Sequence, residues 1–163
     1  MSRGILIFWA GRHHRPEWET LCADYRKRIE HDLPVQDTMI KVKAAAEDPA
    51  RRRLETTALL AAAPDPSWTI VLDPRARQLS TQDFAAELLR LKASWPHPLA
   101  FLIGSDLGLD PDLIGSARDR FSFGPMIFGH ELARLVLYEQ IYRAFSMHKG
   151  LKYHRPAPRG QER

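Results

Sequence analysis

The sequence predicts an α/β fold in which a mostly parallel sheet carries helices on both of its faces. Segments typical of strands and of helices alternate along the chain five times. The central strand segments, 67–72 and 99–103, are short, continuous apolar runs. Such runs are typical of parallel strands that are covered on both faces, and the crossovers between parallel strands are usually helices. Ligands of these sheets bind beyond the carboxyl ends of the strands, so we expect a site there.

The first half of the chain predicts two strands and two helices. Residues 5–9 form a short apolar run, which indicates a buried strand. In 16–29 a proline opens a segment whose apolar residues recur at spacings of mostly three and four, as in a helix. Residues 35–42 alternate loosely and predict a more exposed strand. The next helix is expected over 48–63, with Asp48 as its cap.

The middle of the chain repeats this pattern. The β-rich run 67–72 predicts the third strand. Ser80 is a suitable cap for the helix that follows, and Asp83 stands three residues later in a weaker version of the capping box. The fully apolar segment 99–103 predicts the fourth strand, which ends at a glycine.

Three further elements are expected in the last third of the chain. An Asp-Pro pair predicts a short helix over 110–117, and 121–123 predicts the last strand. A long helix is expected over 130–148. Its expected apolar positions are Leu132, Leu135, Val136, Ile141, Tyr142 and Phe145.

Length and composition favour one globular domain of 163 residues. No apolar run approaches the roughly 18 residues of a membrane span, and the amino terminus lacks the pattern of a signal peptide. The single cysteine, Cys22, excludes an internal disulfide and fits a reducing cytoplasm. We expect Cys22 to serve as buried packing and not as a nucleophile.

The chain is moderately basic, with a net charge of +4, which permits a nucleic-acid partner without requiring one. Basic residues cluster at 26–28 and 51–53, where we expect solvated helix faces, and again from Lys149 onward. In the last cluster Tyr153 and His154 lie among the cations. Aromatic side chains stack on bases and cations contact phosphates, so this segment is the candidate RNA contact.

Common catalytic and cofactor motifs are absent from the sequence. It has no glycine-rich dinucleotide or triphosphate loop, no serine nucleophile elbow and no histidine or cysteine spacing typical of zinc. Glycine-bearing or polar loops follow three of the expected strands, at 72–75, 103–106 and 123–129. Loops of backbone, glycine and apolar side chains suit a largely neutral aromatic ligand, such as an adenosyl group, better than a phosphate.

Several short segments match one known family. They are Gly11-Arg12, Tyr25 with Arg28, the run Leu72 to Ser80, Phe101 to Gly104, His130 with Arg134, Glu139 to Ala144, and Tyr153-His154-Arg155. On these segments the chain resembles the ribosomal RNA large subunit methyltransferase H family of the SPOUT superfamily, over nearly its whole length. The last third is the most specific part, because residue types, spacing and position in the chain all agree.

The resemblance implies one SPOUT domain over 1–155 with a C-terminal trefoil knot. It implies a homodimer whose sites are each completed by the partner chain. From the residues themselves we expect 156–163 to be a short disordered tail, a cytoplasmic location, and neither metal nor membrane as a partner. The implied activity is N3-methylation of a pseudouridine in helix 69 of the 23S rRNA on the assembled ribosome, with S-adenosylmethionine as cofactor. The implied cofactor residues are Leu72, Gly104, Gly124, Pro125, Met126, Ile127, Phe128 and Gly129.

Methyl transfer from a sulfonium needs close approach of the nucleophilic nitrogen and help with its proton. The candidates for this task are Arg143, Tyr153, His154 and Arg155. We expect the two arginines to hold a phosphate or the anionic base, and His154 or Tyr153 to manage the proton. For His130, at the start of the last helix, we favour a structural role.

Four positions depart from the family pattern. Ser105 stands where the family has a second glycine, Leu107 at a commonly acidic position, Gly129 where proline is usual, and Ala76 where glycine is usual. Ser105, Leu107 and Gly129 are the three that bear on the alternatives. If these departures weaken cofactor binding, changing them to Gly, Glu and Pro should raise the affinity. They also motivate two alternatives: a non-catalytic ribosome-binding SPOUT protein, and a SPOUT methyltransferase with a different RNA target.

Overall fold

A computed structural model of the chain describes residues 3–11, 15–43 and 47–153. Five strands form one sheet in the order β2-β1-β4-β3-β5, and each pairing between them is parallel. The strands are β1 (Ile5–Ala10), β2 (Val35–Ile40), β3 (Trp68–Leu72), β4 (Leu99–Ile103) and β5 (Asp119–Phe121). The predicted α/β class and parallel sheet are thereby confirmed, while the trefoil knot stays a prediction.

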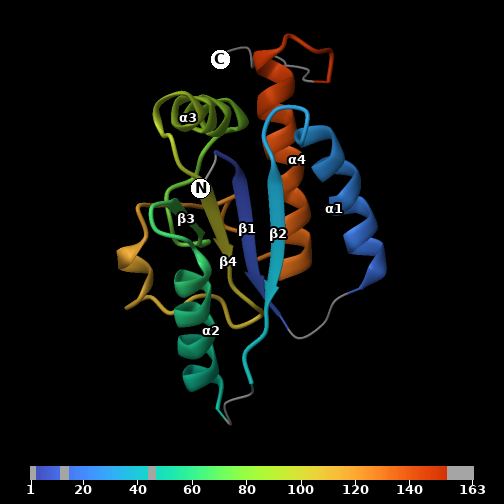
Figure 1. Cartoon of the computed structure of the whole chain (residues 1–163). Helices are drawn as coiled ribbons and strands as arrows, with labels where there is room; N and C mark the ends of the chain where they lie inside the picture. Colours follow the sequence, from blue (N-terminus) through green and yellow to red (C-terminus); the bar gives the residue numbers. More distant parts are fainter. Residues whose placement is uncertain (1–2, 12–14, 44–46, 154–163) are drawn as a thin grey trace, which may run out of the picture.

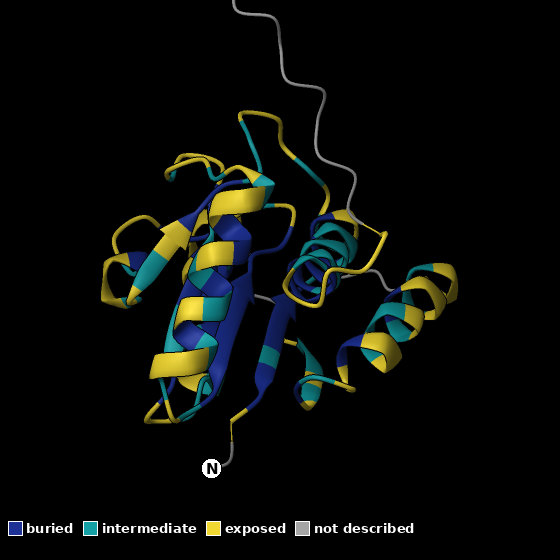
Figure 2. Cartoon of the chain, turned by 90° about the horizontal axis from the view of Figure 1, so that it is seen from above, coloured by how far each residue is buried: buried dark blue, intermediate teal, exposed yellow. Residues whose placement is uncertain are grey.

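Helices cover both faces of the sheet, as predicted (Figure 1). They are α1 (Pro16–Ile29), α2 (Asp48–Ala62), α3 (Thr81–Ser94) and α4 (His130–His148). One face packs against α2, and the opposite face packs against α3 and α4. Helix α1 lies against α4, on the outside of that layer. Figure 2 shows the buried strands between layers whose outer surfaces are exposed.

The central strands are apolar throughout because each face contributes to a separate core. Along β1, Ile7 and Trp9 face the α3 and α4 side, whereas Phe8 and Ala10 face α2. Strand β4 is buried at every position, and its Phe101 has no exposed surface. Truncating a fully buried phenylalanine typically costs about 3–5 kcal/mol, so Phe101→Ala would remove a large part of the stability of a domain this size.

Two predicted elements near the last strand were wrong in detail. Residues 110–117 contain only a short 3₁₀ helix, Ile114–Ser116, in place of an α-helix. The Asp110 carboxylate accepts the backbone N–H of Asp112 at 2.9 Å, and this local bond favours a turn over a continuing helix. The last strand is β5 at 119–121 and not 121–123. It ends there because its partner β3 ends opposite Phe121.

The buried face of α4 also differs from the prediction. Ile141 and Phe145 are buried as expected, but Leu132 is exposed. The helix instead buries Arg134 and Tyr138, which bond to one carboxylate. Hydrophobic periodicity cannot detect this arrangement, because it counts only apolar residues.

Smaller expectations had mixed outcomes. Ser80 caps α3 by accepting the backbone N–H of Asp83 at 3.1 Å, as predicted. The N-cap of α2 is Glu47 and not Asp48. Cys22 is fully buried, which confirms its packing role. Residues 154–163, with the predicted tail, lie outside the described residues.

Candidate active site

The loops that follow β3, β4 and β5 enclose one mostly apolar cavity of about 490 Å³ at the carboxyl end of the sheet. It is lined by Leu72 and Ile103, the last residues of β3 and β4, and by Phe121, the last residue of β5. The start of α4 closes it through His130 and Ala133. The three loops singled out in the sequence therefore meet at one place, as expected for parallel strands.

The residues that the resemblance implied for the cofactor gather at this cavity with one exception. Its lining includes Leu72, Gly104, Gly124, Met126, Ile127, Phe128 and Gly129. Pro125 does not line it and is exposed. Met126 and Ile127 are 71% and 86% exposed, so the rim of the cavity presents apolar side chains to the outside.

Two glycines shape the walls for different reasons. A Cβ on Gly104 would lie 2.7 Å from the backbone carbon of Gly108, so the turn after β4 closes only without a side chain. Gly124 has a φ of 134°, which strongly favours glycine. The Ser122 hydroxyl secures that second turn: it donates to the Gly124 carbonyl at 2.7 Å and accepts the Gly124 N–H at 3.0 Å.

A buried polar network ties the loop after β4 to α2. Ser105 donates to Glu55 at 2.5 Å, and Glu55 lies 3.5 Å from the guanidinium of Arg51. Arg51 in turn donates to both carboxylate oxygens of Asp106 at 3.2 and 3.3 Å. Arg51 is only 5% exposed, so the expectation of a solvated helix face at 51–53 was wrong for this residue.

A second buried network lies behind the opening of α4. The Asp37 carboxylate of β2 accepts hydrogen bonds from Trp9, Arg134 and Tyr138 at 2.7–2.8 Å. Burial, followed by the charge and hydrogen bond of Asp37, raises the pKa of Tyr138. For Arg134 burial lowers the pKa, but the bonds with Glu19 and Asp37 outweigh it and the pKa is raised. Arg134 and Tyr138 therefore keep their protons, and their bonds to Asp37 hold α4 against the sheet.

His130 packs directly beside this network. Its ring stacks on Trp9 with centroids 5.9 Å apart, and a Cβ on Gly11 would lie 2.4 Å from its Nε2 atom. Gly11 thus leaves room for the histidine where α4 meets β1. These contacts fit the structural role that we favoured for His130.

Arg143 and Tyr153, two of the four candidate catalytic residues, lie together at the far end of α4. Both contact Glu139: Arg143 Nε donates at 2.9 Å and the Tyr153 hydroxyl at 3.2 Å. The Arg143 guanidinium lies 4.9 Å from the centre of the Tyr153 ring. Burial, followed by hydrogen bonding with Tyr25 and the charge of Glu139, raises the pKa of Tyr153, so the phenol stays protonated.

This pair is far from the cavity of its own chain. Thirteen residues separate Arg143 from His130, which corresponds to about 20 Å along an α-helix. The structure therefore brings Arg143 and Tyr153 together but does not place them at the cavity. His154 and Arg155 lie outside the described residues.

Sequence reasoning missed several residues that shape the cavity. Arg52 and Ser122 line it, and Glu55 and Arg51 support the loop after β4. For Arg51 and Glu55 a signal existed, because their spacing of four is that of a helical ion pair. Nothing in the sequence linked Ser105 to a helix fifty residues earlier.

Metal-binding clusters and membrane-spanning helices are both absent from the described residues. Across 3–11, 15–43 and 47–153, no three His, Cys, Asp or Glu side chains gather where they would hold a metal ion. In the same residues no helix combines the length and apolar character needed to cross a membrane.

Known proteins resemble this chain in both sequence and fold. Residues 4–154 match the family described as "Predicted SPOUT methyltransferase". The chain is 36% identical to "Ribosomal RNA large subunit methyltransferase H" of Nitratidesulfovibrio vulgaris (strain DP4), over 93% of this chain and 98% of that protein. It is also 36% identical to the protein of the same name from Solidesulfovibrio magneticus, over 92% and 97% of the two chains.

A solved structure supports the fold independently. It is described as a probable methylase family protein from Haemophilus influenzae Rd KW20, with a TM-score of 0.53, 15% identity, and coverage of 94% of this chain and 71% of that one. At this identity the likeness concerns the fold alone. The sequence matches carry the assignment: the chain belongs to the SPOUT methyltransferase family and, within it, to the ribosomal RNA large subunit methyltransferase H group.

Proposed function

We propose that this protein is an S-adenosylmethionine-dependent methyltransferase that modifies N3 of pseudouridine 1915 in helix 69 of the 23S rRNA on the assembled, cytoplasmic ribosome. The observation that carries the proposal is the cavity at the carboxyl end of the sheet, where seven of the eight implied cofactor residues meet. The names of the relatives supply the substrate class.

The cavity fits the implied cofactor. Its volume of about 490 Å³ lies within the range of small-molecule sites, and its lining is mostly apolar with backbone polar groups from glycine-bearing turns. Leu72 and Phe128 offer apolar walls to an adenosyl group, and the close approach at Gly104 fixes the turn beneath them. When bound, S-adenosylmethionine supplies an electrophilic methyl group on its sulfonium.

The remaining chemistry concerns the proton on N3 of the target base. Loss of this proton leaves a negative charge, which cationic and protonated donors stabilise. Arg143 is a fixed cation, and Tyr153 keeps its proton, so both suit donation to the anionic base. In this proposal Tyr153 donates a hydrogen bond and does not accept the proton. His154 is the candidate for accepting the proton, and Arg155 is the candidate for holding a phosphate.

The separation of about 20 Å along α4 supports a composite site in a homodimer. One chain would supply the cavity, and the partner would supply Arg143 and Tyr153. A symmetric dimer then has two equivalent sites, each built from both chains.

Cofactor binding is tested by calorimetry with a matched pair of substitutions. The added Cβ of Gly104→Ala meets backbone atoms at 2.7 and 2.8 Å, whereas that of Gly115→Ala meets nothing within 4 Å. We expect micromolar binding by the wild type, a loss of tenfold or more in G104A, and no change in G115A. Absence of binding by the wild type, with and without ribosomes, would favour the non-catalytic alternative.

Methyl transfer is tested with radiolabelled cofactor and purified ribosomes, and the modified nucleotide is mapped by mass spectrometry. A methyl group at another nucleotide would support the alternative RNA target. Arg143→Ala, Tyr153→Phe, His154→Ala and Arg155→Ala should each reduce the rate, and full activity in all four would contradict the catalytic assignment.

The dimer is tested by mixing two inactive variants, G104A and R143A. In an equal mixture that exchanges subunits, half of the dimers contain one chain of each variant. If each site uses both chains, such a dimer has one intact site, built from the cavity of the R143A chain and from Arg143 of the G104A chain. The mixture should therefore recover about a quarter of wild-type activity. If each chain builds its own site, mixing should recover none.

A further inference from the structure

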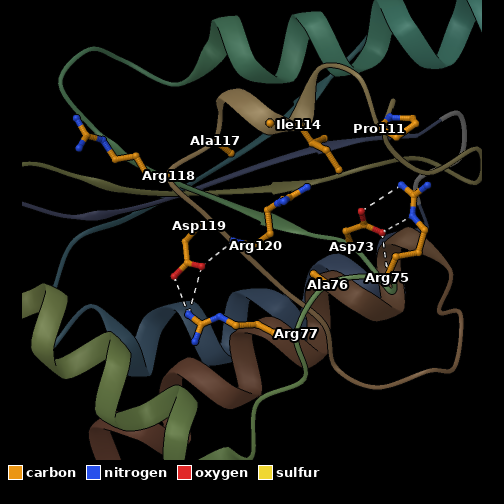
Figure 3. A pocket seen from close by; sticks show the side chains of 11 residues that line it. Asp73, Arg75, Ala76, Arg77, Pro111, Ile114, Ala117, Arg118, Asp119 and Arg120 are labelled. Atoms are coloured by element: carbon orange, nitrogen blue, oxygen red, sulfur yellow. Dashed lines mark hydrogen bonds and ion pairs between the residues drawn. The ribbon is translucent and has the colours of Figure 1, made fainter.

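A second hollow of about 590 Å³ lies beside the candidate cofactor cavity. Figure 3 shows the side chains that line this second hollow. It is bounded by the loop after β3, by the segment around the 3₁₀ helix and by the edge strand β5. Its lining contains four arginines and two aspartates: Arg75, Arg77, Arg118, Arg120, Asp73 and Asp119. Asp73 and Arg75 also line the cofactor cavity, so the two hollows share a wall.

Two of the arginines are held by carboxylates on the walls. Arg75 donates to both oxygens of Asp73 at 3.0 and 3.1 Å, and Arg77 donates to both oxygens of Asp119 at 3.0 and 3.2 Å. Both guanidinium side chains are still more than half exposed. The pairs neutralise the two aspartates and orient the arginines, so that the donors not used in the pairs are available to a ligand.

Arg120 lies between these pairs and is exposed (Figure 3). In the part of the chain that the structure describes, its guanidinium makes no ion pair or side-chain hydrogen bond. Arg118 points away toward Trp68 and Trp95, with its guanidinium 5.4 and 4.9 Å from their ring centres. Four cations against two carboxylates leave the lining with two excess positive charges, and Arg120 is the one most available to an anion.

We propose that this hollow binds backbone phosphates of the RNA strand whose nucleotide enters the cofactor cavity, an inference that rests on the proposed function. Planar guanidinium groups bind phosphate oxygens through paired hydrogen bonds. Arg75, Arg77 and Arg120 are all exposed along its walls, so the hollow is accessible to an extended strand and does not enclose a small anion. The shared wall of Asp73 and Arg75 places the phosphate contacts next to the methyl-transfer site.

The test compares Arg77→Gln, Arg120→Gln and the double variant with Arg53→Gln. Arg53 is a matched control because it is 58% exposed, contacts one aspartate, Asp110, and lies outside both hollows. Binding of purified ribosomes is measured over a series of KCl concentrations, with S-adenosylmethionine affinity and thermal unfolding measured alongside. Inorganic phosphate at constant ionic strength is added as a competitor.

The expected result is a rise of about tenfold in Kd and in KM for ribosomes in Arg120→Gln. The slope of log K against log salt should fall by about one for each phosphate that the variant no longer neutralises. The kcat at saturating ribosomes, the cofactor affinity and the R53Q control should stay at wild-type values. Arg120→Lys keeps the charge but not the paired hydrogen bonds, so it should keep the wild-type salt slope and recover only part of the affinity.

The proposal is overturned if the double variant keeps wild-type affinity and salt slope while folded. Strong competition by millimolar phosphate, with no effect of Arg120→Gln on ribosome binding, would instead assign the hollow to a free anion. Failure of the proposed function looks different: the wild type would bind ribosomes in an Arg120-dependent way and transfer no methyl group.

Discussion

The Ser105 hydroxyl donates a 2.5 Å hydrogen bond to the carboxylate of Glu55, and both side chains are buried. The bond joins the loop after β4 to α2, and Arg51 strengthens the junction by contacting both Glu55 and Asp106. Ser105 is one of the positions that depart from the family pattern. Ser105 therefore anchors a loop that lines the candidate cofactor cavity, which changes what we expect from placing a glycine there.

Ser105→Gly should destabilise the protein and weaken cofactor binding. The change leaves a buried carboxylate without its hydroxyl partner, a loss of about 1–3 kcal/mol. Urea unfolding measures the first effect, and calorimetry with S-adenosylmethionine measures the second. Ser116→Gly is the control, because that hydroxyl is exposed and bonds to the local carbonyl of Leu113. Unchanged stability together with tighter cofactor binding would restore the view that Ser105 weakens the site.

Gly129→Pro should stabilise the protein by about 0.4–1 kcal/mol. Gly129 has a φ of −59°, close to the value that proline imposes, and a Cβ there meets nothing within 4 Å. The gain arises because the unfolded chain loses conformational freedom. Thermal unfolding measures it, and Gly108→Pro is the contrasting variant, since its φ of 70° is incompatible with proline. A lower melting temperature for Gly129→Pro would show that the loop needs glycine.

The sheet and the meeting of its carboxyl-end loops were predictable, because local signals specify both. Apolar runs such as 99–103 indicate buried strands, and parallel strands bring their following loops together. The buried polar contacts were not predictable. Arg134 and Asp37 are 97 residues apart, and an arginine on a helix is exposed in most proteins. The separation of Arg143 from the cavity, by contrast, follows from the helix expected over 130–148, because thirteen residues of α-helix span about 20 Å.

Cys22 should resist thiol reagents in the native state. The residue is fully buried, and burial is the main cause that raises the pKa of its thiol to about 12. Because the thiolate is the reactive form, a coloured disulfide reagent at pH 8 should react only after unfolding. The measurement is the release of its chromophore with and without urea. Rapid reaction in native buffer would mean that α1 opens readily from α4.

Asp73→Asn should lower stability at neutral pH, by an amount that disappears in acid. Burial raises the pKa of Asp73, but the hydrogen bonds and charge of Arg75 outweigh it and hold the pKa below its ordinary value. A carboxyl group whose folded pKa is depressed stabilises the protein above its unfolded value of about 3.9. That contribution is lost as the pH falls through the lower folded value.

This pH dependence is tested by measuring the free energy of unfolding in urea for the wild type and for D73N, from pH 7 down to pH 3. We expect the wild type to exceed D73N by about 1–2 kcal/mol at pH 7, a modest value because Arg75 is largely exposed. The difference should begin to shrink near pH 4. Asp112→Asn removes a carboxylate at an exposed position and serves as the control substitution. A gap that stays constant or grows in acid would mean that the Asp73 carboxylate gains no net stabilisation from Arg75.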